Sequence, residues 1–271
     1  MPCVPGPRRL PTFVIVGAAK SGTTSLASYL RMHPDVYVVP EKELRFFDVA
    51  WDNGLDWYCG FFADAGAAKA VGEATPNYMA DPVAVERLAT TLPEAQLVVT
   101  LRNPVDRLYS NYWHQRMRSS ERRPLREAVT AVPLYSEGSD YLPQLQRLAT
   151  HYPRERLHVL LFEDLRDRPR ETMAEVFRFL GVDPAFVPAN LGKVYNPAAT
   201  VRAPGFRRKM IGARAFRRWP RLARAVDDLN RKKVAYPPIS PADRAWLLER
   251  FARSNDDLAA WLGRDLDAWK V

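Results

Sequence analysis

Short apolar runs alternate with segments of helical periodicity along the first 180 residues. Five runs of aliphatic and β-branched residues, bounded by turn residues, predict buried strands at 12–16, 36–39, 69–73, 97–101 and 157–162. Segments with apolar positions at helical spacing lie between or after them, at 23–32, 81–92, 103 onward, 139–151 and 171–180. Strands that alternate with helices predict a parallel sheet with crossover helices on its faces.

Capping residues mark several of these helix ends. Asp81 and Asn103 are each followed by proline, which is typical of an N-cap and the first helical position. Gly181 is placed to close the helix at 171–180. After about residue 190, proline, glycine and arginine dominate until Ile239, and Ser240 then opens a helical region that reaches Trp269.

The chain shows no internal repeat and no low-complexity linker, so we expect a single domain over residues 1–271. Its expected parts are an α/β core at 12–190, a basic segment at 191–239 and C-terminal helices at 240–271. No stretch approaches the roughly 18 apolar residues that span a bilayer, and no signal-like apolar core precedes the first strand. These features predict a cytoplasmic protein.

The basic charge is concentrated in one segment. The chain carries a net charge of +9, but residues 202–233 hold twelve basic and two acidic residues and account for +10. This segment predicts contact with a localised anionic partner or a membrane surface, and no general binding of nucleic acid. Within it, apolar residues at helical spacing over 206–216 also fit a helix that packs on the core and leaves its basic face in water. The two cysteines, Cys3 and Cys59, make neither a disulfide framework nor a metal site.

The segment "VIVGAAKSGTTSL" has the features of a phosphate-binding loop. Gly17 and Gly22 stand at G-x4-G spacing between a strand and a helix, where backbone N–H groups and the helix dipole favour an anion. An ordinary glycine turn with a lysine in water is the alternative. The residues expected to bind the anion are Lys20, Ser21, Gly22, Thr23 and Thr24.

Two details separate this loop from that of a kinase or ATPase. The lysine lies before the second glycine instead of after it, and Thr23 occupies the usual lysine position. The strand in "AQLVVTLRN" ends in Arg102, where a nucleotide hydrolase places an acidic residue for magnesium. The expected site binds its anion through cations and hydroxyls and requires no metal.

Arg102 and Ser110 form a second candidate anion site. Arg102 leaves the carboxyl edge of a strand, where α/β sheets bind ligands, and Ser110 follows two turns into the next helix. Together they offer a phosphate a guanidinium and a hydroxyl. Taken alone, Ser110 also fits an ordinary surface position.

At this point the chain resembles a known family. The segments "VGAAKSGTTSL", "HPDVYVVPEKELRFFD" and "LVVTLRNPVDRLYSNYW" resemble the sulfotransferases that use 3′-phosphoadenosine 5′-phosphosulfate (PAPS), most closely the heparan sulfate branch. The resemblance covers residues 12–180 and implies a P-loop-like fold of three layers. It implies that the loop from Lys20 to Thr24 binds the 5′-phosphosulfate and that Arg102 and Ser110 bind the 3′-phosphate.

The same resemblance assigns the chemistry. Lys20 is expected to stabilise charge on the bridging oxygen of the leaving phosphate, and Glu43 in "EKELRFFD" to act as general base. Arg45 is expected to contact the sulfate or the acceptor. Without the resemblance, Glu43 also fits a solvated charged loop. Lys193 and Arg202 lie where the family closes a loop over the cofactor.

The chain departs from the heparan sulfate pattern in "GEATPNYM". Ala74 stands where that pattern has lysine, which weakens the expectation of a polyanionic acceptor. Glu73 and Tyr78 either line the acceptor pocket or pack the sheet edge. A group of aromatic residues similarly fits either an acceptor wall or core packing: Trp51, Trp57, Tyr58, Phe61 and Phe62.

These observations together predict an O-sulfotransferase that transfers a sulfuryl group from PAPS to a hydroxyl of a carbohydrate or small natural product, leaving 3′-phosphoadenosine 5′-phosphate (PAP). The Ala- and Arg-rich composition favours a bacterial source. A P-loop nucleotide kinase and a non-catalytic polyanion-binding protein are the alternatives. The first predicts ATP turnover with Mg²⁺, and the second predicts steep salt dependence that persists without Lys20.

Overall fold

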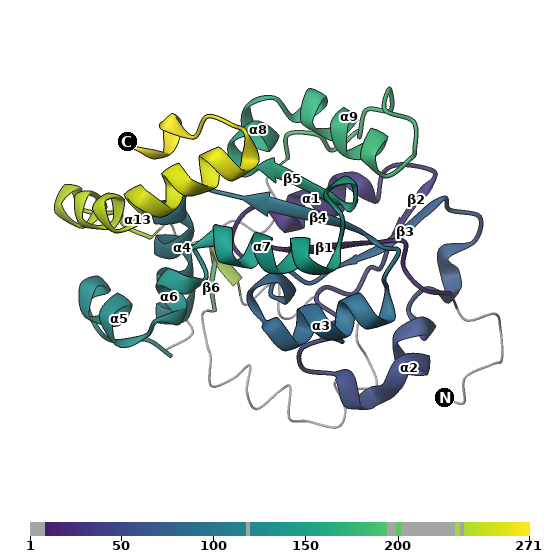
Figure 1. Ribbon diagram of the computed structural model, residues 1–271, viewed down its shortest axis with the longest axis horizontal. Coiled ribbons are helices and arrows are strands. Elements are labelled where there is room, and N and C mark those ends of the chain that lie inside the picture. The colour runs from purple at the N-terminus through teal and green to yellow at the C-terminus, as the bar shows by residue number, and fades with distance from the viewer. Residues whose placement is uncertain (1–8, 118–119, 194–198, 202–230, 234–235) are drawn as a thin grey trace.

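A parallel sheet of five strands in the order β2-β3-β1-β4-β5 forms the centre of the molecule (Figure 1). The computed structural model describes residues 9–117, 120–193, 199–201, 231–233 and 236–271. The strands of the sheet are β1 (Phe13–Gly17), β2 (Val36–Val38), β3 (Ala70–Ala74), β4 (Gln96–Leu101) and β5 (Leu157–Leu161).

Helices follow the strands in chain order. Those before β5 are α1 (Thr23–Leu30), α2 (Gly54–Gly60), α3 (Pro82–Thr91), α4 (Pro104–Met117), α5 (Leu125–Ala131), α6 (Leu134–Glu137) and α7 (Tyr141–His151). Those after it are α8 (Phe162–Asp167), α9 (Pro169–Phe179) and α13 (Pro241–Leu262).

Both faces of the sheet are covered by helices, which makes three layers. Along β1, Val14 and Val16 pack with residues of α3 and α7, whereas Phe13 and Ile15 pack with residues of α1 and α9. All four side chains are fully buried because both faces of a parallel sheet are covered. The predicted α/β class is therefore confirmed.

The C-terminal helix α13 joins two parts of the molecule. Leu247 and Phe251 pack with buried residues of α4 and α5, and Leu258 further along packs into the cluster beside the sheet. Ser240 caps α13, since its hydroxyl accepts a hydrogen bond of 3.1 Å from Asp243 N. The predicted helical extension is confirmed and adds to the core.

The predicted helix caps are also present. Asp81 Oδ1 accepts hydrogen bonds from two N–H groups of α3, and Asn103 Oδ1 accepts one of 3.0 Å from Val105 N. Gly181 follows α9 with φ at 71°, a left-handed conformation that suits glycine. The short helices α5, α6 and α8 were not predicted, because each spans two turns or fewer and leaves little periodicity.

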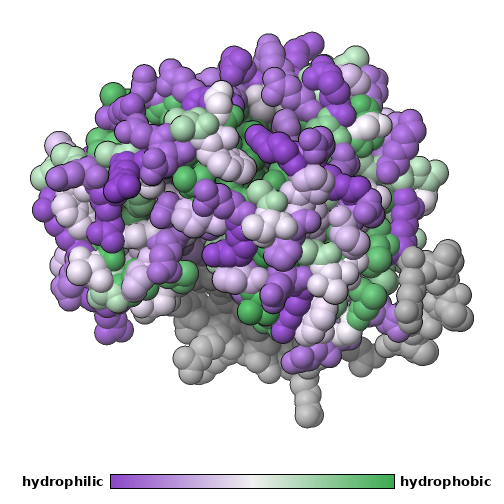
Figure 2. Space-filling model, viewed as in Figure 1, coloured by the Kyte–Doolittle hydropathy of each residue, from purple (hydrophilic) through white to green (hydrophobic). Residues whose placement is uncertain are grey.

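The basic segment is described only at its ends. There β6 (Ala199–Val201) and β7 (Arg231–Lys233) pair as an antiparallel ladder. The expected helix over 206–216 lies outside the described residues. The visible face of the molecule is mostly hydrophilic, with apolar residues in small separate groups (Figure 2). None of the helices in the described ranges is long and apolar enough to cross a bilayer.

Candidate active site

The loop between β1 and α1 presents the uncapped start of a helix. Gly22 is the N-cap residue, with φ at 84°, and no side chain caps the first turn of α1. A Cβ atom at Gly22 would lie 2.6 Å from Cδ2 of Phe162, so the close approach of this ring requires glycine. The N–H groups of the first turn have no helical acceptor and favour an anion at this position.

Hydroxyl residues surround this helix start. Thr23 is buried and Thr24 half-buried, and Ser21 before them is fully buried. Lys20 has a left-handed backbone with φ at 73°. Ala18 N donates a hydrogen bond of 2.8 Å to Thr100 O at the end of β4, which ties the loop to the neighbouring strand.

Lys42, which the sequence analysis did not single out, lies against this loop. Its ammonium donates hydrogen bonds of 3.2 Å to Thr23 Oγ1 and 3.0 Å to Thr24 Oγ1. Burial lowers the pKa of Lys42 to about 8; the charge of Glu43 opposes this effect and that of Arg31 adds to it.

Among the described residues, no carboxylate lies within ion-pair distance of the Lys42 ammonium. A desolvated cation that contacts only hydroxyl groups favours a phosphate or sulfonate beside it, because the anion would balance its positive charge. The one signal for Lys42 in the sequence was its place directly before Glu43.

Arg102 connects the two predicted anion sites. Its Nη1 donates a hydrogen bond of 3.3 Å to the carbonyl oxygen of Lys20. Its guanidinium carbon also lies 5.0 Å from the ring centre of Phe162, the residue that packs against Gly22. The carboxyl ends of β1 and β4 therefore meet at one place, as parallel strands require. Ser110 lies six residues into α4 and is half-buried.

Glu43 is exposed, whereas the next residue, Leu44, is buried and anchors the segment. The negative charge of Glu43 raises the pKa of Lys42, and it also contributes to the raised pKa of Arg45. Glu43 thus has a cationic neighbour on each side in the chain. An exposed carboxylate next to the anion loop is accessible to an acceptor.

Arg45 is engaged within its own segment. Its Nε and Nη2 donate hydrogen bonds of 2.9 and 2.6 Å to Asp48 Oδ2, and this pairing is the main reason that the pKa of Arg45 is raised. The backbone of Arg45 is left-handed, with φ at 55°. In this structure the guanidinium that was expected to contact the sulfate or the acceptor forms an ion pair with Asp48.

Glu73 and Tyr78 form a buried pair, and Tyr78 is hydrogen-bonded to the backbone of residues 43–46, which we call the Glu43 segment. Both are fully buried, and Tyr78 Oη donates a hydrogen bond of 2.9 Å to Glu73 Oε1. Of the two alternatives that the sequence leaves open for these residues, their burial and hydrogen bonding favour packing at the sheet edge.

Those remaining candidates that the structure describes lie around α1 and α2. Tyr29 Oη donates a hydrogen bond of 3.0 Å to the carbonyl of Lys193, which places the backbone of Lys193 beside α1. Arg202 lies outside the described residues. Of the aromatic group, Tyr58 and Phe62 are fully buried and belong to the core, while Trp57 is 37% exposed.

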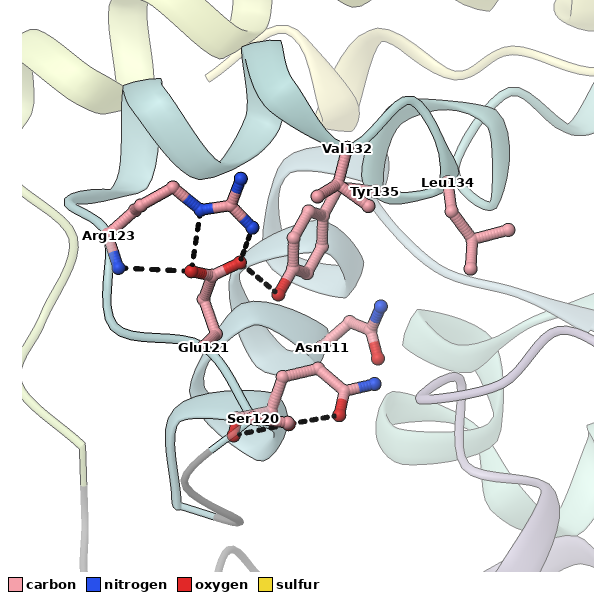
Figure 3. A pocket seen from close by; sticks show the side chains of 8 residues that line it. Asn111, Ser120, Glu121, Arg123, Val132, Leu134 and Tyr135 are labelled. Carbon is pink, nitrogen blue, oxygen red and sulfur yellow. Dashed lines mark hydrogen bonds and ion pairs between the residues drawn. The ribbon is translucent and has the colours of Figure 1, made fainter.

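A separate pocket with an accessible volume of about 180 Å³ lies on α4 and the residues that lead into α5 and α6 (Figure 3). Its charged groups are paired with each other, since Arg123 Nε and Nη2 each donate a hydrogen bond of 2.9 Å to the carboxylate of Glu121. Asn111 and Gln115 on α4 also line the pocket.

The fold and the loops define a class of protein: an α/β protein with a P-loop-like loop at the carboxyl edge of a parallel sheet. Residues 10–193 match the family model described as the sulfotransferase domain. The chain therefore belongs to the sulfotransferase family, as its motifs predicted.

Relatives and solved structures agree with this family. The chain is 33% identical over 201 residues to human bifunctional heparan sulfate N-deacetylase/N-sulfotransferase 2. This alignment covers 65% of the present chain and 22% of the human protein. It is 41% identical over 108 residues to mouse heparan sulfate glucosamine 3-O-sulfotransferase 6, covering 40% and 31%. The chain thus spans about a fifth to a third of the length of these relatives.

A crystal structure of a sulfotransferase from Alicyclobacillus acidocaldarius superimposes with a TM-score of 0.73 at 28% identity. This match covers 97% of the present chain and all of the other chain.

Proposed function

We propose that this protein transfers the sulfuryl group of PAPS to a hydroxyl group of a carbohydrate or small natural product. The observation that carries the proposal is the hydrogen bond from Arg102 to the carbonyl of Lys20, which brings two predicted anion sites together. A donor with phosphates on both sides of one adenosine requires such a pair. Membership of the sulfotransferase family supports the same donor.

The donor would occupy the two sites as follows. The first turn of α1 and the hydroxyls of Thr23 and Thr24 would bind the 5′-phosphosulfate, and Arg102 with Ser110 would bind the 3′-phosphate. Lys42 would contact the sulfonate or the 5′-phosphate, because its ammonium already lies on the threonine hydroxyls.

Bound PAPS would supply an activated sulfuryl group, whose bond to the phosphate oxygen breaks on transfer. The role of Lys20 is to stabilise the negative charge that grows on this bridging oxygen. The role of Glu43 is to accept the proton of the acceptor hydroxyl as its oxygen attacks sulfur. The site therefore needs one base and a set of fixed cations.

We assign a hydroxyl acceptor, although the names of the relatives include both N- and O-sulfotransferases. An alcohol carries its lone pair at neutral pH, whereas an alkylammonium must lose a proton before its nitrogen can attack sulfur. The absence of lysine at position 74 favours an acceptor of low charge over a polyanion.

The test combines binding and turnover. Calorimetry would compare PAP with ATP and Mg²⁺, and radiolabelled PAPS would then be offered with a panel of matched alcohols and amines. We expect PAP to bind more tightly than ATP and sulfate to pass to alcohols. ATP hydrolysis with Mg²⁺ and no PAP binding would instead identify a nucleotide kinase or ATPase, and transfer only to amines would overturn the assignment of the acceptor.

A further inference from the structure

The carboxylate of Glu73 at the end of β3 is surrounded by three hydroxyl donors. Tyr58 and Tyr78 donate hydrogen bonds of 3.0 and 2.9 Å to Oε1, and Thr75 donates one of 2.7 Å to Oε2. Glu73, Tyr58, Thr75 and Tyr78 are all fully buried. A buried ionised carboxylate is costly, so a fully satisfied one points to a specific role.

Two of these hydroxyls also bind the segment that follows Glu43. Thr75 Oγ1 accepts a hydrogen bond of 3.3 Å from Arg45 N, and Tyr78 Oη accepts one of 2.8 Å from Phe46 N. Each hydroxyl therefore donates to Glu73 and accepts from the backbone. Tyr58 differs, because its hydroxyl donates to Glu73 and contacts no backbone N–H of this segment.

The direction of these hydrogen bonds depends on the charge of Glu73. An ionised carboxylate only accepts, which matches three donors, whereas a protonated carboxyl must donate one hydrogen. One hydroxyl would then have to turn its hydrogen away from Glu73, and inside the core this hydrogen would lose its acceptor. With Glu73 ionised, all three hydroxyls donate to it, and the oxygens of Thr75 and Tyr78 accept the N–H groups of Arg45 and Phe46 at the same time.

The surroundings set this ionisation near neutral pH. Burial raises the pKa of Glu73 to about 7, against the effect of the three hydroxyl hydrogen bonds, and the charge of Asp48 raises it further. The other titratable neighbours are Tyr58 on α2 and Tyr78 after β3, whose pKa values burial raises, so both phenols stay neutral. The charged pair of Arg45 and Asp48 faces the network from the segment after Glu43.

We propose that Glu73 is a positioning residue, whose ionised carboxylate holds the Glu43 segment in its reactive geometry through Thr75 and Tyr78. This inference rests on the proposed function, since it assigns Glu43 as the base. It assigns no contact between Glu73 and substrate.

The decisive variants are Glu73→Gln and Tyr78→Phe, with Tyr58→Phe as the matched control. Both tyrosines are buried, donate to the same carboxylate oxygen and pack their rings against the phenylalanines of the segment after Glu43, but only the Tyr78 hydroxyl accepts a hydrogen bond from its backbone. For Glu73→Gln and Tyr78→Phe we expect kcat to fall about 10- to 100-fold, as misplacing a catalytic group does. PAP affinity should change less than about 2-fold. Tyr58→Phe should keep kcat within about 3-fold of the wild type at a pH well above 7, where Glu73 is ionised in both proteins.

The pH profile of kcat separates positioning from simple support of the fold. In the wild type, kcat should fall as pH drops through about 7, and this limb should be absent from the profile of Glu73→Gln. Equal losses in Tyr58→Phe and Tyr78→Phe, or a wild-type kcat in Glu73→Gln, would overturn the proposal.

Amide hydrogen exchange gives a readout that needs no substrate. The N–H groups of Arg45 and Phe46 should exchange faster in Glu73→Gln and Tyr78→Phe than in Tyr58→Phe at the same pH. If the wild type transfers no sulfate, the proposed function fails, while this exchange pattern still tests the network. Unchanged exchange at both amides would refute it.

Discussion

The ends of β1 and β3 lie side by side at one edge of the sheet, yet they have opposite chemistry. After β1, the loop presents an uncapped helix start, and Lys42, a desolvated cation from the segment after β2, donates to its threonine hydroxyls. After β3, a buried carboxylate, Glu73, has three hydroxyl donors. Threonine hydroxyls occur at both ends, so residue type alone does not separate them.

The difference is whether the polar groups are satisfied by the protein itself. The hydrogen-bond partners of the Glu73 carboxylate are protein hydroxyl groups, and such a network fixes the geometry of the backbone that is bonded to it. Around the first turn of α1, the helix N–H groups and the Lys42 cation favour binding of an anion. Adjacent strands thus provide the binding site and its support.

Loss of the base should have the largest effect. In Glu43→Gln, kcat should fall by about 10²- to 10⁴-fold, because the amide cannot accept the acceptor proton. PAP affinity should stay unchanged in calorimetry, since Glu43 lies outside the anion loop. Glu41→Gln, two residues earlier and also exposed, is the control and should retain turnover. Full activity of Glu43→Gln would remove Glu43 from the role of base.

Removal of the loop lysine should be next in size and should affect both binding and turnover. In Lys20→Ala, kcat/KM for PAPS should fall about 10²- to 10³-fold, because one stabilising donor at the leaving oxygen is lost. Lys69→Ala removes an exposed lysine that pairs with Asp35 away from the loop, and should have no effect on kinetics. A Lys20→Ala enzyme that lost affinity but kept kcat would limit Lys20 to ground-state binding.

Arg102→Ala should weaken nucleotide binding more than chemistry. PAP affinity should fall about 10- to 100-fold, the range for a hydrogen bond to a charged group. Adenosine 5′-phosphate, which lacks the 3′-phosphate, should bind the variant and the wild type almost equally. Titration calorimetry with both nucleotides measures the difference. An equal loss for the two ligands would place Arg102 on the 5′ side.

Lys42 should give the smallest effect, seen as proton uptake. Its pKa is lowered to about 8 in the ligand-free protein, and a bound anion should raise it again. PAP binding near pH 8.5 should therefore take up part of a proton, and affinity should fall as pH rises through 8. Calorimetry in buffers of different ionisation enthalpy measures the uptake, which Lys42→Met should abolish. Equal uptake in the variant would assign the proton elsewhere.

Local patterns predicted much of the fold. Caps such as Asp81 and Ser240, and apolar strands such as β1, are properties of neighbouring residues, and the structure reproduces them. The G-x4-G loop and the strand that ends before Arg102 were visible for the same reason.

The contacts that the sequence did not indicate are those between distant segments. Phe162 meets Gly22 across the sheet edge, and Lys42 reaches Thr24 from a different loop, so no local spacing records either contact. Likewise, Glu73 was equally consistent with facing an acceptor or packing inside. The burial of β3 between two layers favours packing, and burial is a property of the assembled fold.

A crystal structure with PAP is the most direct test of the central claim that two strand ends share one nucleotide. We expect the 5′-phosphate at the start of α1, within hydrogen-bonding distance of Lys20 and the Thr24 hydroxyl, and the 3′-phosphate on Arg102 and Ser110. A nucleotide bound elsewhere, or phosphates distant from both Lys20 and Arg102, would contradict the account.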